Sequence, residues 1–343
     1  MSSILAGIGW HTIGAAAAAS FYAPIEKVRK WSWETTWIVA GIFSWVLLPV
    51  LVSLILLPHF LGFYSSIPSH VLTLTFLFGC MWGVGNVGYG LTMRYLGMSL
   101  GIGVAIGVTL VVGTLIPPIA HGRLLYLLTS RMGIFTIAGI VLALIGIAVV
   151  SWAGHQREQR MGIRAEEFNL KKGLLLAILC GIFSSGMSFA IDAARPMALA
   201  AQHAGVRPLY AALPSYVIIM GGGALINFGY CFFRLGFSRQ LSLRRDFSEP
   251  RRVLLVNGCM AAAGGIMWYF QFFFYAWGAA NIPARISFIN WMLHMSLYVL
   301  FGGLIGLALG EWRQARGRPV RLLWVGMIII IIAANLVGLG AAS

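Results

Sequence analysis

Ten stretches of mostly apolar residues occupy most of this 343-residue chain, and nearly all of its charges lie between them. A helix of about twenty residues crosses the hydrocarbon core of a bilayer, and a charge inside that core is costly. The pattern therefore predicts an all-α membrane protein with ten transmembrane helices. We place the helices at 4–24, 36–57, 71–93, 98–120, 132–152, 173–194, 209–233, 253–278, 286–310 and 320–341.

The composition excludes two broad classes of protein. Only 10% of the residues are charged and 59% are hydrophobic, whereas roughly a quarter of the residues of a soluble domain are charged. The net charge of +15 does not indicate nucleic-acid binding, because the basic residues lie in short loops beside apolar spans, where they orient the chain and contact anionic lipids. We expect membrane lipids as neighbours, no nucleic acid and no obligatory protein partner.

The basic residues also predict which helix ends face the cytoplasm. The odd-numbered connections carry 19 of the 24 Lys and Arg residues, and the even-numbered connections carry the other 5. By the positive-inside rule the odd connections are cytoplasmic, so both termini are periplasmic in a bacterial inner membrane. The first basic residue, Lys27, follows the first span, which is the wrong order for a cleaved signal peptide. We expect the first helix to stay in the mature protein.

The sequence predicts an internal duplication that divides the chain in the middle. The cytoplasmic connector 153–172 separates five spans in 1–152 from five in 173–343. A five-span unit duplicated head to tail inserts its second copy upside down. A Met-Trp pair at 81–82 in the third span, followed by an amide, is echoed at 267–268 in the eighth. The expected fold is two inverted five-helix repeats, an architecture of secondary transporters whose site lies between the halves.

Two short motifs match catalytic signatures in the wrong context. Residues 83–88 fit G-x-G-x-x-G, which binds dinucleotides only between a strand and a helix. Residues 97–101 fit G-x-S-x-G, which needs a strand–turn–helix elbow with acid and His partners. Both lie in or at the start of apolar spans, where glycines are typical of close helix packing. We expect no enzyme, no metal site and no cofactor, because the four cysteines also lie within spans and lack metal-type spacing.

Three titratable side chains within spans are candidates for carrying a proton. An unperturbed histidine titrates near pH ~6.5, so His294 and His11 are able to take up a proton outside and release it inside. The alternative for each is a neutral histidine that is hydrogen-bonded between helices. Asp192 is the third candidate, although Arg195 three residues later makes a local ion pair the simpler interpretation. We rank His294 first because of its polar neighbours on the same helix.

Amide and aromatic side chains repeat at helical spacing in three spans. Ser287, Asn290 and His294 share one face of the ninth helix, and such a polar face must point into the bundle. Sugar hydroxyls need amide partners, and sugar C–H faces pack on aromatic rings. The candidates for sugar hydroxyls are Asn86, Gln271 and Asn290. The candidates for the apolar sugar face are Trp82, Trp268 and Tyr275.

Several longer runs of residues carry a resemblance to a known family. They are Phe21-Tyr22-Ala23-Pro24, Lys30-Trp31-Ser32-Trp33-Glu34-Thr35, Gly90-Leu91-Thr92-Met93-Arg94-Tyr95-Leu96-Gly97-Met98-Ser99, residues 165–173, Leu213-Pro214-Ser215-Tyr216, Gln271-Phe272-Phe273-Phe274-Tyr275-Ala276-Trp277-Gly278 and Trp291-Met292-Leu293-His294-Met295-Ser296. Through these runs the whole chain resembles the bacterial L-rhamnose–proton symporters, a branch of the drug/metabolite transporter superfamily.

The resemblance implies ten helices in two inverted repeats. It also implies uptake of L-rhamnose across the inner membrane by alternating access, driven by the proton gradient. Two other functions stay open from the residues alone. One is a transporter or exchanger of another small polar metabolite on the same fold, which direction and substrate would distinguish. The other is a membrane enzyme or sensor, for which we find no catalytic constellation.

Overall fold

The computed structural model describes residues 2–162, 169–237 and 243–342, and within these residues all regular structure is helical. Ten helical segments are long and apolar enough to cross a membrane, as predicted. They are Ile4–Ile25, Trp33–Leu56, Ser69–Leu96, Met98–Ala120, Arg131–Arg160, Leu170–His203, Ser215–Phe237, Arg251–Ala280, Ile289–Ala308 and Arg318–Leu339. The protein is therefore an all-α, ten-span membrane protein.

The first five spans contain two breaks in regular α-helix. Their elements are α1 (Ser2–Ser20) and α2 (Tyr22–Ile25); α3 (Trp33–Gly41), the π-helix η1 (Ile42–Leu47) and α4 (Leu48–Leu56); α6 (Ser69–Leu96); α7 (Met98–Ala120); and α9 (Arg131–Arg160). Two short helices, α5 (Phe60–Ser66) and α8 (Leu124–Thr129), lie in the connections. The second span begins at α3 because the Ser32 hydroxyl accepts a hydrogen bond from the Thr35 backbone N–H at 3.3 Å.

The sixth span is the most interrupted segment of the second half. The elements of this half are α10 (Leu170–Ser184), α11 (Gly186–Ala193) and α12 (Arg195–His203); α13 (Ser215–Phe237); α15 (Arg251–Ala280); α16 (Ile289–Ala308); and α17 (Arg318–Ala342). The connections contain α14 (Leu243–Asp246) and the 3₁₀ turns η2 (Ala284–Ile286) and η3 (Arg313–Ala315).

Three of the predicted span boundaries are wrong by more than five residues. The sequence predicts an end at 152, but α9 continues through two polar turns to Arg160, because helical backbone needs no apolar side chains once it leaves the bilayer. The sixth span is predicted to end at 194, yet α12 carries it to His203. The seventh is predicted to begin at 209, whereas α13 begins at Ser215 after a series of turns.

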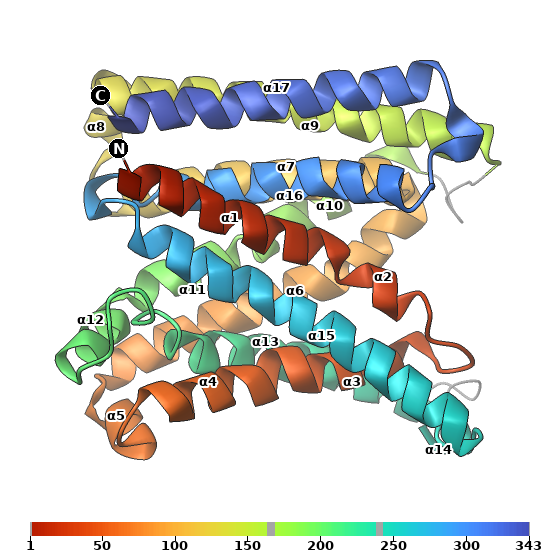
Figure 1. The fold of residues 1–343 in the computed structure, drawn as a ribbon, viewed down its shortest axis with the longest axis horizontal. Coiled ribbons are helices and arrows are strands. Elements are labelled where there is room, and N and C mark those ends of the chain that lie inside the picture. The colour runs from red at the N-terminus through yellow and green to blue at the C-terminus, as the bar shows by residue number, and fades with distance from the viewer. Residues whose placement is uncertain (1, 163–168, 238–242, 343) are drawn as a thin grey trace.

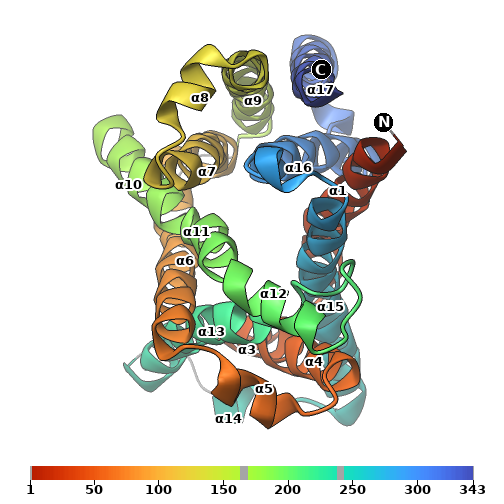
Figure 2. The same ribbon diagram turned by 90° about the vertical axis from the view of Figure 1, so that its left-hand side faces the viewer.

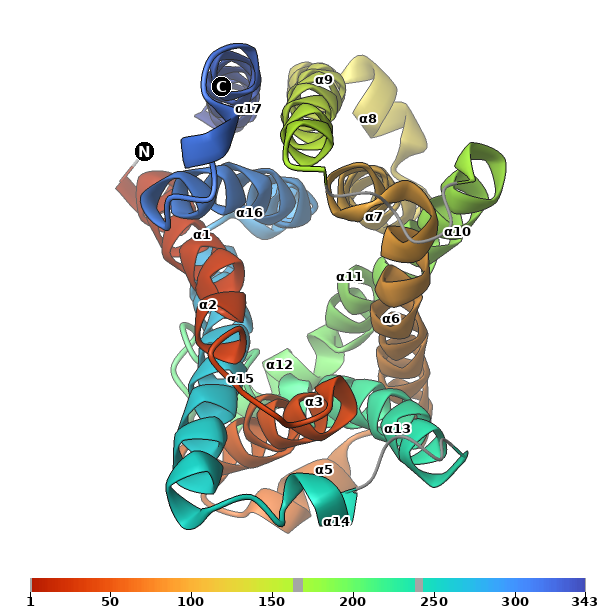
Figure 3. The same cartoon turned by 90° about the vertical axis from the view of Figure 1, so that its right-hand side faces the viewer.

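The spans run side by side, and the two ends of the bundle differ (Figure 1). Both termini lie at one end with α5, α8 and α12; we call this the termini end. The connection between α2 and α3 lies at the opposite end with α14, and we call this the basic end because most Lys and Arg lie in its connections. Figures 2 and 3 view the molecule from these two ends and show the helices standing around a central region.

Glycines hold neighbouring helices at close range. A Cβ atom at Gly146 of α9 would lie 2.7 Å from a side-chain carbon of Ile330 in α17, and one at Gly79 of α6 would lie 2.1 Å from the Ile219 carbonyl oxygen in α13. The motif at 83–88 lies inside α6, where a Cβ at Gly85 would lie 2.5 Å from the Ser184 backbone nitrogen. The prediction that this motif serves helix packing is confirmed.

The second motif marks a helix start. Gly97 has φ of +81°, a conformation that glycine adopts without strain, and it separates α6 from α7. Ser99 donates both its backbone N–H and its hydroxyl to Glu158 Oε1, at 2.9 and 2.7 Å. A carboxylate at a helix N-terminus is stabilised by the free N–H groups and the helix dipole. Glu158 therefore caps the start of α7, and the serine of G-x-S-x-G binds this carboxylate.

Candidate functional site

A cavity of about 720 Å³ lies between α7 and several helices that follow residue 173. Side chains from α7 and from the second-half helices α11, α12, α13, α15 and α16 line it. The polar ones include His121, Arg123, Ser188, Asp192, Arg195, Gln202, Asn281, Ser287 and Asn290, and the large apolar ones include Ile191, Tyr216, Ile219, Tyr275, Phe288 and Trp291. Two of its lining residues, His121 and Arg123, are exposed and lie in the connection between α7 and α8. Figure 2 shows this connection at the termini end, so the cavity opens at that end.

One amide links the cavity wall to a buried histidine. Asn290 lines the cavity, and its Oδ1 lies 2.8 Å from His11 Nε2 across 279 residues of sequence. The Asn290 Nδ2 atom donates to the Ser287 carbonyl at 2.8 Å, which fixes the orientation of the amide. Since an amide oxygen only accepts hydrogen bonds, His11 Nε2 carries the hydrogen, and His11 Nδ1 is left with its lone pair. That Nδ1 atom is buried and has no hydrogen-bond partner among the described residues.

The second histidine, His294, packs beside the first. His294 is fully buried, and neither of its ring nitrogens has a hydrogen-bond partner within the described part of the chain. Its ring centroid lies 6.0 Å from that of His11 and 5.3 Å from that of Tyr275. Tyr275 also contacts His11, at 5.0 Å between centroids, and it lines the cavity. The structure thus brings together four of the predicted residues: His11, His294, Asn290 and Tyr275.

Asp192 lies in the cavity wall with a different set of partners. Its Oδ1 lies 3.0 Å from Arg195 Nε, so the local ion pair expected from the sequence is present. Its Oδ2 lies 2.7 Å from His121 Nε2, and Arg195 Nη2 donates to the Ser287 hydroxyl at 2.8 Å. Nothing in the sequence pattern points to His121, because it lies 71 residues away from Asp192. These charges form a cluster near the cavity entrance.

The other predicted sugar-binding residues do not line the cavity in this conformation. Gln271 is buried, and its Nε2 atom has no hydrogen-bond partner in the described ranges; the same is true of Asn86 Nδ2. Trp82 and Trp268 contact other aromatic rings, at 6.0 and 6.2 Å from Phe272. Their roles in sugar binding stay predictions.

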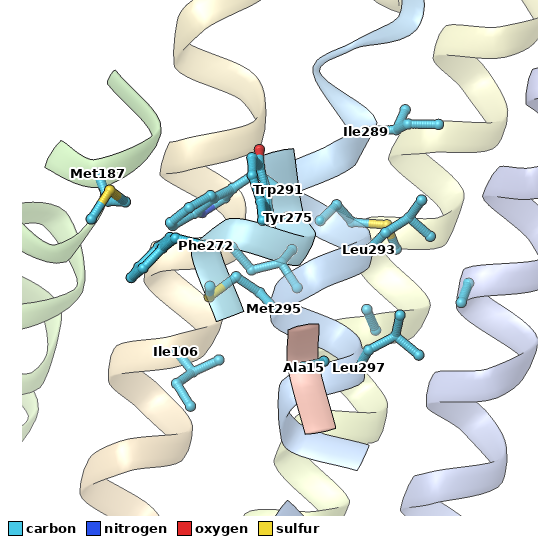
Figure 4. Packing of buried hydrophobic residues seen from close by; sticks show 14 of the residues in the cluster. Ala15, Ile106, Met187, Phe272, Tyr275, Ile289, Trp291, Leu293, Met295 and Leu297 are labelled. Carbon is cyan, nitrogen blue, oxygen red and sulfur yellow. The ribbon is translucent and has the colours of Figure 1, made fainter. Parts of the chain in front are cut away.

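Six aromatic side chains form a closed circuit between the cavity and the basic end. Consecutive ring centroids lie 4.6 to 6.5 Å apart. In order around the circuit the residues are Phe21, Trp37, Trp45, Trp82, Phe272 and Trp268, and we call them the six-ring cluster. The Phe272 ring centroid also lies 5.8 Å from that of the cavity residue Tyr216, so the six-ring cluster directly contacts the cavity wall. Figure 4 shows Phe272 next to Tyr275 and Trp291.

Polar contacts tie the basic end together beyond the six-ring cluster. Arg234 Nε lies 3.3 Å from Glu34 Oε1. Asp246 Oδ2 accepts the Ser32 backbone N–H and hydroxyl at 2.9 and 2.5 Å, and the Thr35 hydroxyl at 2.7 Å. Burial alone would raise the pKa of the Asp246 carboxyl, but these hydrogen bonds and the nearby Arg245 guanidinium hold its pKa below the usual range. Aromatic and charge-assisted contacts therefore hold the helices together at the end opposite the cavity entrance.

Comparison with known proteins gives one consistent result. The family model described as "L-rhamnose-proton symport protein" matches residues 1–343. An L-rhamnose-proton symporter of Shigella boydii serotype 18 is 59% identical over 342 residues, which cover 100% of this chain and 99% of the relative. An L-rhamnose-proton symporter of Escherichia coli strain SMS-3-5 is 58% identical over the same length and coverage.

Proposed function

This chain belongs to the L-rhamnose-proton symport family, and from that premise we propose how its cavity binds the sugar and the proton together. The protein is a transporter in the bacterial inner membrane, and it moves L-rhamnose with protons. The observation that carries the site assignment is the Asn290 amide, which lines the cavity and is bonded to His11. One side chain thereby faces both the sugar space and a titratable group.

The Asn290 amide has capacity left for a sugar. Its contact with Ser287 uses one of its two N–H donors, and its contact with His11 uses one of two acceptor sites on Oδ1. The remaining donor and acceptor match a hydroxyl, which both donates and accepts. Ser188 and Tyr275 add further hydroxyls to the cavity lining. We assign sugar binding to this group first, with Asn86 and Gln271 as candidates in another conformation.

We assign the proton to the two buried histidines. Protonation of His11 at Nδ1 makes its Nε2–H a charged donor, and a charge-assisted hydrogen bond to Asn290 is roughly twice as strong as a neutral one. A buried charge without partners is costly in the membrane interior. A sugar hydroxyl that polarises the same amide therefore favours protonation, and protonation in turn favours sugar binding by the same factor. His294, the first choice from sequence, lies against His11 as the second member of the pair.

We place Asp192 at the entrance rather than at the coupling centre. Its carboxylate is already engaged by Arg195 and His121, and its hydrogen-bond partners do not include the two buried histidines. It remains the third candidate for proton coupling.

The contacts at the site also support the proposed division into 1–152 and 173–343. His11 in the first half pairs with Asn290 in the second, and Thr109 in the first half accepts a hydrogen bond from Trp291 in the second. A site shared between two five-span units is what inverted repeats and alternating access require. We propose that the structure represents the state open at the termini end.

The proposed transport cycle is tested by pH recording. We expect L-rhamnose to make the medium of de-energised, weakly buffered cells more alkaline, because each sugar molecule carries protons inward. L-fucose and D-glucose serve as controls and should give no pH change. Entry of labelled L-rhamnose without alkalinisation would contradict proton coupling, and neither signal would indicate a different small polar metabolite.

We further propose that the termini end faces the periplasm. The connections that the sequence predicts to be cytoplasmic carry 19 of the 24 Lys and Arg residues. Among the described residues, the first of these connections, between α2 and α3, lies at the end opposite the termini. Alkaline phosphatase fused to the C-terminus should therefore be active, since it folds only in the periplasm, and a green fluorescent protein fusion at the same position should be dark. The reverse pair of results would place the cavity entrance on the cytoplasmic side.

A further inference from the structure

Trp291 is a cavity residue for which the proposed function has so far given no role. It follows Asn290 on α16, lines the same cavity, and is only 3% exposed. In Figure 4 its ring lies beside that of Tyr275, and the two centroids are 6.0 Å apart in an edge-to-face arrangement. Nothing in the sequence gives a reason to prefer Trp291 over the eleven other tryptophans.

Two contacts with α7 fix the position of the indole ring. Its Nε1–H donates to the Thr109 carbonyl at 3.0 Å. Gly113 leaves room for the same edge of the ring, because a Cβ atom there would lie 2.3 Å from Trp291 Nε1. The polar edge of the indole is thus directed into α7, and the ring itself forms part of the cavity wall. A ring held in this way loses little side-chain entropy when a ligand binds against it.

The backbone of α7 is itself anchored at this point. Pro117 has no N–H, so the Gly113 carbonyl four residues earlier lacks its helical donor. The Ser188 hydroxyl of α11 supplies the missing hydrogen bond at 2.6 Å. This cross-helix bond holds the Gly113 backbone, and through it the space that the indole occupies. The position of Trp291 is therefore determined by three helices.

We propose that Trp291 is a fixed platform against which the apolar face of the sugar packs, and that Gly113 positions it. This rests on the proposed function. A pyranose ring presents hydroxyls at its edge and C–H groups on its faces, and L-rhamnose adds a methyl group in place of a hydroxymethyl. Asn290 is adjacent in sequence and offers hydrogen bonds, while the small part of the buried Trp291 ring that reaches the cavity offers an apolar contact. The pair therefore selects a sugar with one strongly apolar side.

Three variants test the platform. Trp291→Ala should raise the KM for L-rhamnose at least about tenfold, equivalent to ~1.4 kcal/mol of binding free energy, with the maximal rate within about twofold of the wild type. Trp291→Phe should give a smaller rise, because a shorter ring remains. Gly113→Ala should behave like Trp291→Ala, since its new methyl group displaces the indole. The matched control is Gly107→Ala on the same helix, where a Cβ meets only the Leu144 Cδ2 atom at 3.3 Å.

A double variant separates positioning from general damage. If Gly113 acts only through the indole, adding Gly113→Ala to Trp291→Phe should cost no more than Trp291→Phe alone, so the two effects are not additive. Kd values of purified protein for L-rhamnose should follow the KM values. If L-rhamnose makes the medium of cells with the wild-type protein more alkaline, proton-coupled transport holds independently of the results for the variants. If Trp291→Ala has the KM of the wild type, the proposed role of Trp291 is wrong. If Trp291→Ala does not fold, a wild-type KM in both Trp291→Phe and Gly113→Ala leads to the same conclusion.

Discussion

Replacing His11 or His294 with alanine is expected to abolish accumulation of L-rhamnose against its concentration gradient. The ratio of internal to external labelled sugar at steady state should fall to about one, because a carrier without a proton site only equilibrates its substrate. Exchange of labelled for unlabelled L-rhamnose across the membrane should persist, since the cavity and its Asn290 amide remain. The measurement is uptake at an imposed pH gradient, followed by exchange in de-energised cells.

The conservative variant His11→Gln makes this test sharper. Glutamine is able to donate a hydrogen bond to Asn290 but takes up no proton, so it should keep exchange at a higher rate than His11→Ala while still failing to accumulate sugar. His70→Ala is a matched control because His70 is exposed and lies at the start of α6. If either His11→Ala or His294→Ala accumulates sugar as the wild type does, that histidine is not the essential proton carrier.

The arrangement of spans was largely predictable from the sequence, because the bilayer imposes one strong rule on it. A helix across the membrane needs a continuous apolar stretch, and the predicted span 98–120 coincides with Met98–Ala120. The errors fall where that rule does not apply. Polar turns carry α9 to Arg160 beyond the apolar stretch, and the sixth span continues past the apolar region to His203. Hydropathy detects the membrane portion of a helix and not its full length.

The candidate site was predictable only in part, because helical periodicity describes one helix at a time. It correctly places Asn290 and His294 on one side of α16. It does not reveal that Asn290 reaches the cavity while His294 lies behind it. His121, one of the two partners of Asp192, lies 71 residues from it, and Thr109, the partner of Trp291, lies 182 residues away. Such pairs arise from the packing of whole helices, which no local pattern in the sequence encodes.

The six-ring cluster gives the second prediction with a large expected effect. Replacing Trp45 and Trp82 together with alanine should open the basic end of the bundle. Both side chains are nearly fully buried, at 2% and 4% exposure, and deleting a buried aromatic side chain costs about 3–5 kcal/mol. A shift of about 5.5 kcal/mol converts a 99:1 population of two states into 1:99. We expect these rings to be packed against one another only while the basic end is closed, so losing both removes free energy from the present state alone and moves the balance toward a state open at the basic end.

Thiol labelling measures this balance directly. In a cysteine-free background, Ile191→Cys places a thiol in the cavity wall at a half-buried position, and an impermeant reagent should reach it from the termini end only. With Trp45 and Trp82 replaced, labelling should shift to the basic end. The matched control is Trp324→Ala, because Trp324 is 49% exposed on α17 and lies outside the cluster. Labelling that remains confined to the termini end in the double variant would mean that the contacts of Arg234 and Asp246 close the far end without the rings. Closure would then depend on electrostatics, and removing Asp246 rather than the tryptophans would open it.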